Sequence, residues 1–370
     1  MTENLSTRIE RALQEQLAAG CASTVFPGAS ASVAFWDRGA WHYVDAAAGL
    51  RAEGSLPVTV DTFYDLASLT KPWVATAALR LHQAGVFDLG ERVEELIPEA
   101  NGLPVGERNW EEVLSHRSGL EAWVPFYETL PDEPGTDAAR KWILAQLLPH
   151  WDANTVGRAV YSDLGYIVAG VAMGRAAGKP LDEVVAERGA LALGVDDTVF
   201  FGPSWSDDDW KARCAPTGWS SWRGRTLTGE VHDDNCAALG GVAGHAGMFG
   251  LARSVATFGA ACVAAWHGRR GAEEEELVRH AAARRPGGTH RLGWDGKAEH
   301  GSAAGRSIDA DAFGHLGFTG TSLWCDPRRQ LVMVLLSNRV AVSSDNAAIR
   351  AFRPLFHEAI VLAFDGRQGP

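Results

Sequence analysis

Strand-forming segments stand near both ends of this chain, whereas helix-forming segments fill its middle. Near the N-terminus, residues 29–50 contain two β-like runs on either side of a tight turn signal, which predicts a hairpin. Near the C-terminus, the apolar run 330–338 follows a Pro-containing turn, which predicts a second hairpin with residues 321–326. Residues 66 to about 185 instead repeat apolar side chains with a period of about 3.6. The simplest fold is of the α+β class, an α/β sandwich in which both chain ends build one antiparallel sheet around a mostly helical insertion.

Amphipathic helices are predicted at the two termini, where they would flank this sheet. The first carries one apolar stripe, formed by Leu5, Ile9, Leu13 and Leu17. The last covers residues 346–364. We therefore divide the chain into an α/β sheet domain, made of residues 1–65 and 285–370, and a mostly helical domain of residues 66–284.

Composition excludes several classes of function. The chain has 370 residues, of which 46% are hydrophobic and 22% charged, so it can bury a large core. A net charge of −12 argues against a nucleic-acid partner, because binding phosphates needs a basic surface. The five cysteines form no Cys-x-x-Cys pair, which excludes zinc ribbons and fits reduced thiols in a cytosolic protein. We see no signal peptide and no run of about 20 apolar residues, so we expect a cytoplasmic protein without a membrane span.

A serine and a lysine stand one helical turn apart in an apolar segment. Ser68 and Lys71 form the only Ser-x-x-Lys pattern of the chain, and a helix would place both side chains on one face. A neighbouring amine can accept the serine proton, and the first turn of a helix offers free N–H groups to a developing oxyanion. The alternative is a helix-capping serine beside a lysine that extends toward solvent.

Two further segments carry candidate chemistry. Tyr161 precedes an apolar helix for which Asp163 is the expected cap, and a cation nearby would lower the pKa of the phenol and make it a base. In residues 313–327, glycines interrupt a strand pattern and would let a ligand approach the backbone, with His315 facing the cleft. The alternatives are a core tyrosine and a bulged strand pair with a structural histidine.

Together and in this order, these segments resemble the serine β-lactamase and penicillin-binding-protein superfamily. The likeness is greatest to its class C-like branch, which includes esterases, D-aminopeptidases and D-Ala-D-Ala carboxypeptidases. It is carried by the segments FYDLASLTKP (63–72), EEVLSHRSGL (111–120), YSDLGYIVAG (161–170), VHDDNCAALGGVAGHAGMFG (231–250) and FGHLGFTGTSLWCDP (313–327). The resemblance implies a β-lactamase/transpeptidase-like fold with an active site in the cleft between the two domains.

The resemblance also implies a role for individual residues. Ser68 would be the acylated nucleophile, Lys71 its proton partner, and Tyr161 the base for acylation and for activating the deacylating water. The N–H groups of Ser68 and Phe318 would form the oxyanion hole, and Gly317 would keep the strand open to substrate. No cofactor is implied.

Two departures from the family pattern bear on the substrate. Asp163 replaces an asparagine, and a carboxylate cannot donate a hydrogen bond to a substrate carbonyl; contact with Lys71 would also favour the ammonium and leave Tyr161 as the more probable base. His315 and Leu316 replace the lysine and threonine that hold a β-lactam carboxylate. Both changes favour a small-molecule ester, or a small amide, with an uncharged acid part. A β-lactamase, a D-amino-acid amidase or carboxypeptidase, an acyltransferase and a non-catalytic binding protein remain alternatives.

Other residues are candidates for recognition rather than chemistry. Trp123 and Trp219 lie in segments without clear secondary structure, and we expect them to border the substrate pocket. His232 and His245 match no metal-ligand spacing, so we predict no metal site and expect His232 to order the loop beside the cleft.

Overall fold

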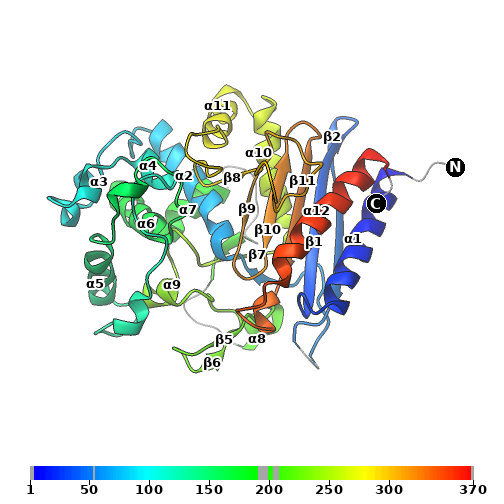
Figure 1. Ribbon diagram of the computed structural model, residues 1–370, viewed down its shortest axis with the longest axis horizontal. Helices are drawn as coiled ribbons and strands as arrows, with labels where there is room; N and C mark the ends of the chain where they lie inside the picture. The colour runs from blue at the N-terminus through cyan, green and yellow to red at the C-terminus, as the bar shows by residue number, and fades with distance from the viewer. Residues whose placement is uncertain (1–3, 53–54, 191–198, 203–207, 368–370) are drawn as a thin grey trace.

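A computed structural model describes residues 4–52, 55–190, 199–202 and 208–367 of the chain. Its main element is a six-stranded antiparallel sheet with the strand order β2-β1-β11-β10-β9-β8 (Figure 1). The strands are β1 (Gly28–Asp37), β2 (Ala40–Gly49), β8 (Asp295–Gly296), β9 (Phe313–Leu316), β10 (Ser322–Asp326) and β11 (Leu331–Ser337). Both predicted hairpins are confirmed, because β1 pairs with β2 and β10 with β11. The chain therefore has the predicted α+β fold.

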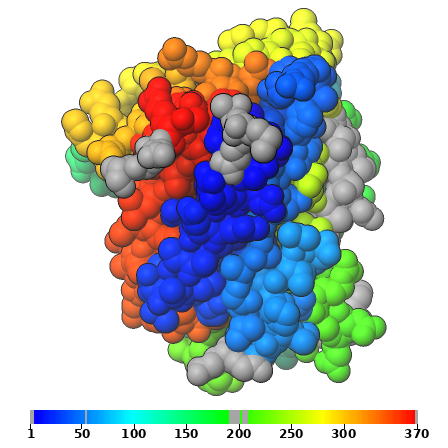
Figure 2. All heavy atoms as spheres, turned by 90° about the vertical axis from the view of Figure 1, so that its right-hand side faces the viewer, coloured from blue at the N-terminus to red at the C-terminus, as the bar shows by residue number. Residues whose placement is uncertain are grey.

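Helices cover both faces of the sheet. Helices α1 (Leu5–Ala22) and α12 (Ala348–Asp365) lie side by side on one face, as Figures 1 and 2 show, and α10 (Ala252–Trp266) covers the other face. Alternate residues of β11 enter two separate hydrophobic clusters, one with α1 and α12 and one with α10. A strand buried on both faces needs apolar side chains at every position, which explains the continuous apolar run that the sequence shows here.

The helical part packs around one almost fully buried helix, α2 (Thr70–Gln83). Helices α6 (Asp163–Ala177), α7 (Leu181–Val185) and α11 (Ala272–Ala281) pack against it. The same part of the chain contains α3 (Val93–Leu96), α4 (Trp110–Leu114), α5 (Asp137–Leu147), α8 (Asp208–Arg213) and α9 (Asp234–Ala238). Short strands pair as β3 (Tyr64–Asp65), β7 (Met248–Gly250) and β4 (Val199–Phe201), and as β5 (Trp219–Ser220) with β6 (Arg225–Thr226).

Among the described helices, none is both long and apolar enough to cross a bilayer. All five cysteines are unpaired.

The sheet and the helical part meet at the segment that precedes α2. Thr319 and Thr321, which follow β9, donate hydrogen bonds to the carbonyl oxygens of Asp65 and Leu66 at 2.8 and 3.1 Å. This contact brings the end of β9 against the Ser68 turn, although some 250 residues separate the two segments. The division of the chain into two domains at residues 65 and 285 stays a prediction.

Candidate active site

Ser68 lies in a strained turn that leads into α2. The turn is a single 3₁₀ turn, Ala67–Leu69, and α2 begins at Thr70 directly after it. Ala67 has a φ of 48°, a left-handed conformation that is costly for a residue with a Cβ atom. The Asp65 carboxylate holds the turn, since Oδ1 accepts from the Ala67 N–H at 2.7 Å and Oδ2 from the His232 N–H at 2.6 Å. Ser68 thus precedes α2, and Lys71 lies in the first turn of that helix.

Lys71 is buried beneath the Ser68 hydroxyl. Its Nζ lies 3.0 Å from Ser68 Oγ, 2.6 Å from Asp163 Oδ1 and 3.2 Å from the His245 carbonyl oxygen. Burial lowers the pKa of Lys71, because the charged form loses its hydration, and the Asp163 carboxylate opposes that shift. Lys71 thus stays connected to the nucleophile while its ammonium is made easier to deprotonate.

The Tyr161 phenol is the second group at the nucleophile. It lies close enough to Ser68 to interact with its hydroxyl, and its ring centroid lies 4.7 Å from Lys71 Nζ. Burial, followed by the nearby Asp163 carboxylate, raises the pKa of Tyr161 well above its usual range. The expectation of a lowered pKa is therefore wrong, because losing hydration penalises the phenolate more than the neighbouring cation favours it. The lowered pKa of Lys71 and the raised pKa of Tyr161 together favour Lys71 as the group that accepts the Ser68 proton.

Asp163 has a different local role from the one expected. The N-cap of α6 is Ser162, whose hydroxyl accepts from the Gly165 N–H at 3.1 Å. Asp163 is instead the first residue of α6, which leaves its carboxylate free to reach Lys71. A serine hydroxyl can accept from the free N–H groups of a first turn as an aspartate carboxylate does, so the N-cap is Ser162, one residue before the expected Asp163.

The oxyanion hole predicted at Ser68 and Phe318 is geometrically available. The Phe318 N–H has no hydrogen-bond acceptor among the described residues, and the Gly317 carbonyl of the same peptide group accepts from Arg353 Nη2 at 2.6 Å, which fixes the peptide plane. At Gly317, an added Cβ would lie 2.0 Å from Thr321 Oγ1 and 2.7 Å from the Leu66 carbonyl oxygen. Gly317 is therefore needed for close contact with the nucleophile turn. It also lines the cavity at Ser68, and its expected role in access of the substrate stays a prediction.

His315 lines the cavity but carries no charge there. It is 3% exposed, and its Nδ1 lies 2.8 Å from the Leu316 carbonyl oxygen. Burial, together with Lys71 and His290, lowers the pKa of His315 well below its usual range. A neutral imidazole cannot replace a lysine ammonium as an anchor for a carboxylate, which agrees with the inference drawn from the sequence.

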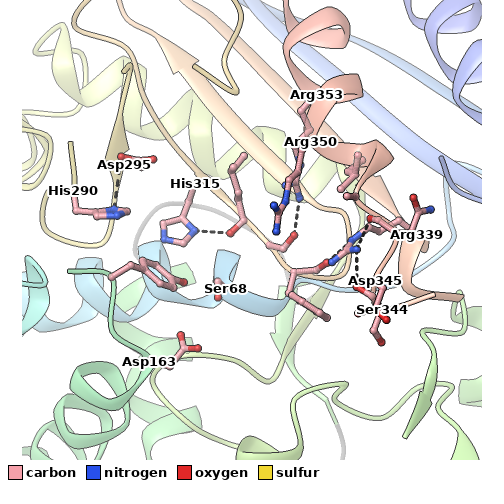
Figure 3. A pocket seen from close by; sticks show the side chains of 17 residues that line it. Ser68, Asp163, His290, Asp295, His315, Arg339, Ser344, Asp345, Arg350 and Arg353 are labelled. Carbon is pink, nitrogen blue, oxygen red and sulfur yellow. Dashed lines mark hydrogen bonds and ion pairs between the residues drawn. The ribbon is translucent and has the colours of Figure 1, made fainter. Parts of the chain in front are cut away.

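The structure adds residues that sequence reasoning missed (Figure 3). His290 and Asp295 line the Ser68 cavity, with Nδ1 and Oδ1 3.6 Å apart, and the His290 ring lies 5.3 Å from the Tyr161 ring. The pairing of Asp295 with Gly314 in the sheet places this pair next to His315, a long-range contact that no local motif signals. Three arginines of the C-terminal part line the opposite wall: Arg339, Arg350 and Arg353. They were overlooked because they lie in and before a helix that was interpreted only as cover for the sheet.

Ser68 opens onto two cavities, which share Ser68, Asp163, Phe318 and Ser344. The first, of about 760 Å³, contains Tyr161, the His290–Asp295 pair and the three arginines. The second, of about 470 Å³, contains Trp123, Tyr127, His232, His245 and two further aspartates.

The other residues that were predicted to take part in recognition lie in different parts of the site. Trp123 lines the second cavity, whereas Trp219, 62% exposed, lines an adjoining hollow beside Tyr127. His232 stacks on the Phe318 ring at 5.7 Å, and His245 Nε2 lies 2.9 Å from Asp233 Oδ1. Both histidines thus order the walls, and no group of metal-ligating side chains occurs within the described part of the chain.

The family model described as Beta-lactamase matches residues 9–354 of the sequence. The chain belongs to the Beta-lactamase family. This family member is 29% identical over 304 residues to an N-acetylmuramyl-L-alanine amidase of Bacillus subtilis (strain 168), an alignment that covers 75% of the chain and 68% of the relative. It is also similar in structure to a class C beta lactamase from Rhodobacter sphaeroides, with a TM-score of 0.67 and 18% identity over 94% of the chain and 99% of that protein. The hydrolase EstCE1, described as having promiscuous acyltransferase activity, gives a TM-score of 0.71 and 19% identity over 95% of the chain and 99% of that protein.

These comparisons confirm the predicted family and the predicted fold. This Beta-lactamase family member thus has the β-lactamase fold of a family of serine hydrolases. Proteins similar to it are named as an amidase, a class C beta lactamase and a hydrolase with promiscuous acyltransferase activity.

Proposed function

We propose that the protein hydrolyses carboxylic esters through an acyl-enzyme formed at Ser68. The observation that carries this proposal is the contact of one serine hydroxyl with two proton-transfer groups, the Lys71 amine at 3.0 Å and the Tyr161 phenol. A serine is a weak nucleophile by itself, and such a contact is the arrangement that activates it.

In the proposed acylation, neutral Lys71 takes the Ser68 proton while Oγ attacks the ester carbonyl. The N–H groups of Ser68 and Phe318 stabilise the oxyanion that forms. The bond to the alcohol then breaks, and the alkoxide takes the proton of the Tyr161 phenol. The Lys71 ammonium passes the proton that came from Ser68 to the phenolate, so both groups are neutral again in the acyl-enzyme. Water repeats the sequence in reverse, which releases the acid and restores the Ser68 hydroxyl.

The groups around the nucleophile support an ester whose acid part carries no negative charge. His315 is neutral and Leu316 is aliphatic, so neither supplies the cation that an anionic acyl group requires. The Asp163 carboxylate, held by Lys71 at 2.6 Å, cannot donate a hydrogen bond to an amide carbonyl. An ester also needs less stabilisation than an amide, because an alcohol is the better leaving group.

A D-amino-acid amidase or carboxypeptidase is the second candidate, and one observation favours it. Arg350 lines the first cavity, is exposed, and forms no ion pair with a described residue. It offers a site for the carboxylate of a peptide leaving group. Acyl transfer to an alcohol or amine in place of water is a variant of the same chemistry.

Mass spectrometry and turnover together test the proposal. We expect p-nitrophenyl butyrate to be hydrolysed and to leave a butyryl group on Ser68, and Ser68→Ala to abolish both. Nitrocefin and D-alanyl-D-alanine, assayed in parallel, separate the alternatives. Unchanged ester hydrolysis by Ser68→Ala would rule out the mechanism, and the absence of any covalent adduct would favour a non-catalytic binding protein.

A further inference from the structure

The second cavity at Ser68 has an aromatic wall and an acidic wall. The aromatic wall consists of Trp123, Tyr127 and Phe318, and the acidic wall of Asp163, Asp233 and Asp234. No described lysine or arginine lines this cavity, whereas three arginines line the first one. Among the charged side chains described, only carboxylates therefore line the second cavity, whereas the three arginines of the first are matched by three aspartates, Asp163, Asp295 and Asp345.

The carboxylates of the acidic wall face the cavity, and the groups that pair with them lie behind them. The side chains of Asp163, Asp233 and Asp234 are 18%, 25% and 18% exposed. Their partners Lys71, His245 and Arg223 are only 0%, 1% and 9% exposed. A positive group in the cavity would thus approach the carboxylates before the buried groups that pair with them.

Two further groups in the second cavity can bind an alkylammonium group, a buried histidine nitrogen and an exposed tryptophan ring. His245 lines the cavity, and its Nδ1 has no hydrogen-bond partner in the described structure. Since Nε2 donates to Asp233, Nδ1 is left as an acceptor for an N–H group. Trp123 is 47% exposed, a large area for an aromatic ring, and aromatic faces attract alkylammonium groups.

The two walls are held in fixed relation by Asn235. This residue is 1% exposed and follows Asp234 directly. Its Nδ2 donates to the Val124 carbonyl oxygen at 2.8 Å, and its Oδ1 accepts from the Tyr127 N–H at 3.3 Å. The aromatic loop is therefore tied to the acidic loop before any ligand arrives, which reduces the ordering cost of binding.

The positions of the proton donors decide which half of the substrate enters this cavity. Tyr161 and His290 line the first cavity and not the second. The leaving alcohol needs a proton, so it must depart on the side of Tyr161. The acyl part then extends from the Ser68 carbonyl carbon into the second cavity.

We propose that this second cavity binds an alkylammonium group carried by the acyl part, so that aminoacyl esters are the preferred substrates. This inference rests on the proposed ester hydrolysis at Ser68, and it replaces the expected uncharged acid part with a cationic one. The protonated amine lies between the Trp123 face and the Asp233 carboxylate, with an N–H directed to His245 Nδ1.

The test compares two p-nitrophenyl esters of nearly equal shape, 6-aminohexanoate and heptanoate, which differ by one positive charge. We expect kcat/KM to favour the cationic ester about tenfold, as a cation between an aromatic face and a carboxylate implies. Asp233→Asn keeps the acceptor oxygen and removes the charge, so the preference should fall toward one. Trp123→Leu should reduce it in part, and Asp137→Asn, an exposed carboxylate on α5 outside both cavities, should leave it unchanged.

A binding measurement separates this site from the proposed reaction. The Ser68→Ala variant is titrated calorimetrically with the methyl esters of the same two acids. Equal binding of the two esters, together with an equal kcat/KM in the wild type, would overturn the cation site and leave the esterase intact. Tighter binding of the cationic ester without turnover of either ester by the wild type would overturn the esterase and retain the site.

Discussion

Gly317→Ala is expected to disable the oxyanion hole without altering any side chain that does chemistry. The added Cβ would lie 2.0 Å from Thr321 Oγ1 and 2.7 Å from the Leu66 carbonyl oxygen, where ordinary contacts begin at 3.4 Å. Thr321 can rotate away, but only by giving up its 3.1 Å hydrogen bond to that same carbonyl. The Leu66 backbone cannot rotate, so the end of β9 must move away from the Ser68 turn.

The expected magnitude follows from these contacts. Forcing a methyl group into a packed site costs about 1–3 kcal/mol, and a lost buried hydrogen bond adds about 1 kcal/mol. We therefore expect the free energy of unfolding to fall by about 2–4 kcal/mol. The displaced Phe318 N–H should also lower the acylation rate by about 10²-fold, the usual effect of removing one oxyanion donor.

Urea unfolding and burst-phase acylation with p-nitrophenyl butyrate measure the two effects separately. Gly90→Ala is the matched control, because the only atom near its added Cβ is Asp88 Oδ1 at 3.6 Å; it should change neither quantity appreciably. If Gly317→Ala were acylated at the wild-type rate, the role given to the Phe318 N–H would be refuted, even if the variant were less stable.

Two other substitutions test the proton-transfer groups. Asp163→Asn removes the carboxylate that raises the pKa of both Lys71 and Tyr161, so the ascending limb of the pH profile of kcat/KM should move to lower pH; an unmoved limb would mean that neither group controls it. The His290 ring lies 5.3 Å from the Tyr161 ring, where it can support proton donation by the phenol, so His290→Gln should slow alkyl esters about tenfold or more while sparing p-nitrophenyl esters, whose leaving group needs no proton. An equal loss of rate on both kinds of ester would show that His290 and its partner Asp295 have only a structural role.

The elements that could be predicted from the sequence are those encoded by local spacing. The contact of Ser68 with Lys71 follows from one turn of helix, and the helix formed where the apolar pattern placed it. The apolar run 330–338 and the turn before it were enough to predict a strand, which the structure places at Leu331–Ser337. Tyr161 could be placed at the nucleophile only by resemblance to a family, since 93 residues separate it from Ser68.

The features that could not be predicted depend on which distant side chains surround a group. The pKa of Tyr161 rises because the fold buries the phenol and brings Asp163 near, and no local pattern encodes either contact. The His290–Asp295 pair reaches the cavity through strand pairing with β9. Trp219 was expected at the pocket from its loop context alone, and that context does not distinguish the cavity from the adjoining hollow.

Asp163 links the two halves of the proposed mechanism, because it lies where the cavities meet and also pairs with Lys71. An amide at this position would leave the buried amine without a counter-charge and the second cavity with one negative charge fewer. The carboxylate therefore influences both the protonation of the base and the charge of the acyl site, and Asp163→Asn alone cannot distinguish these effects. Asp233, which pairs with His245 and does not hydrogen-bond to Lys71, changes the acyl site with far less effect on the base. A cationic preference that is lost in Asp233→Asn, with the pH profile unchanged, would therefore show that recognition and proton transfer are separable in this site.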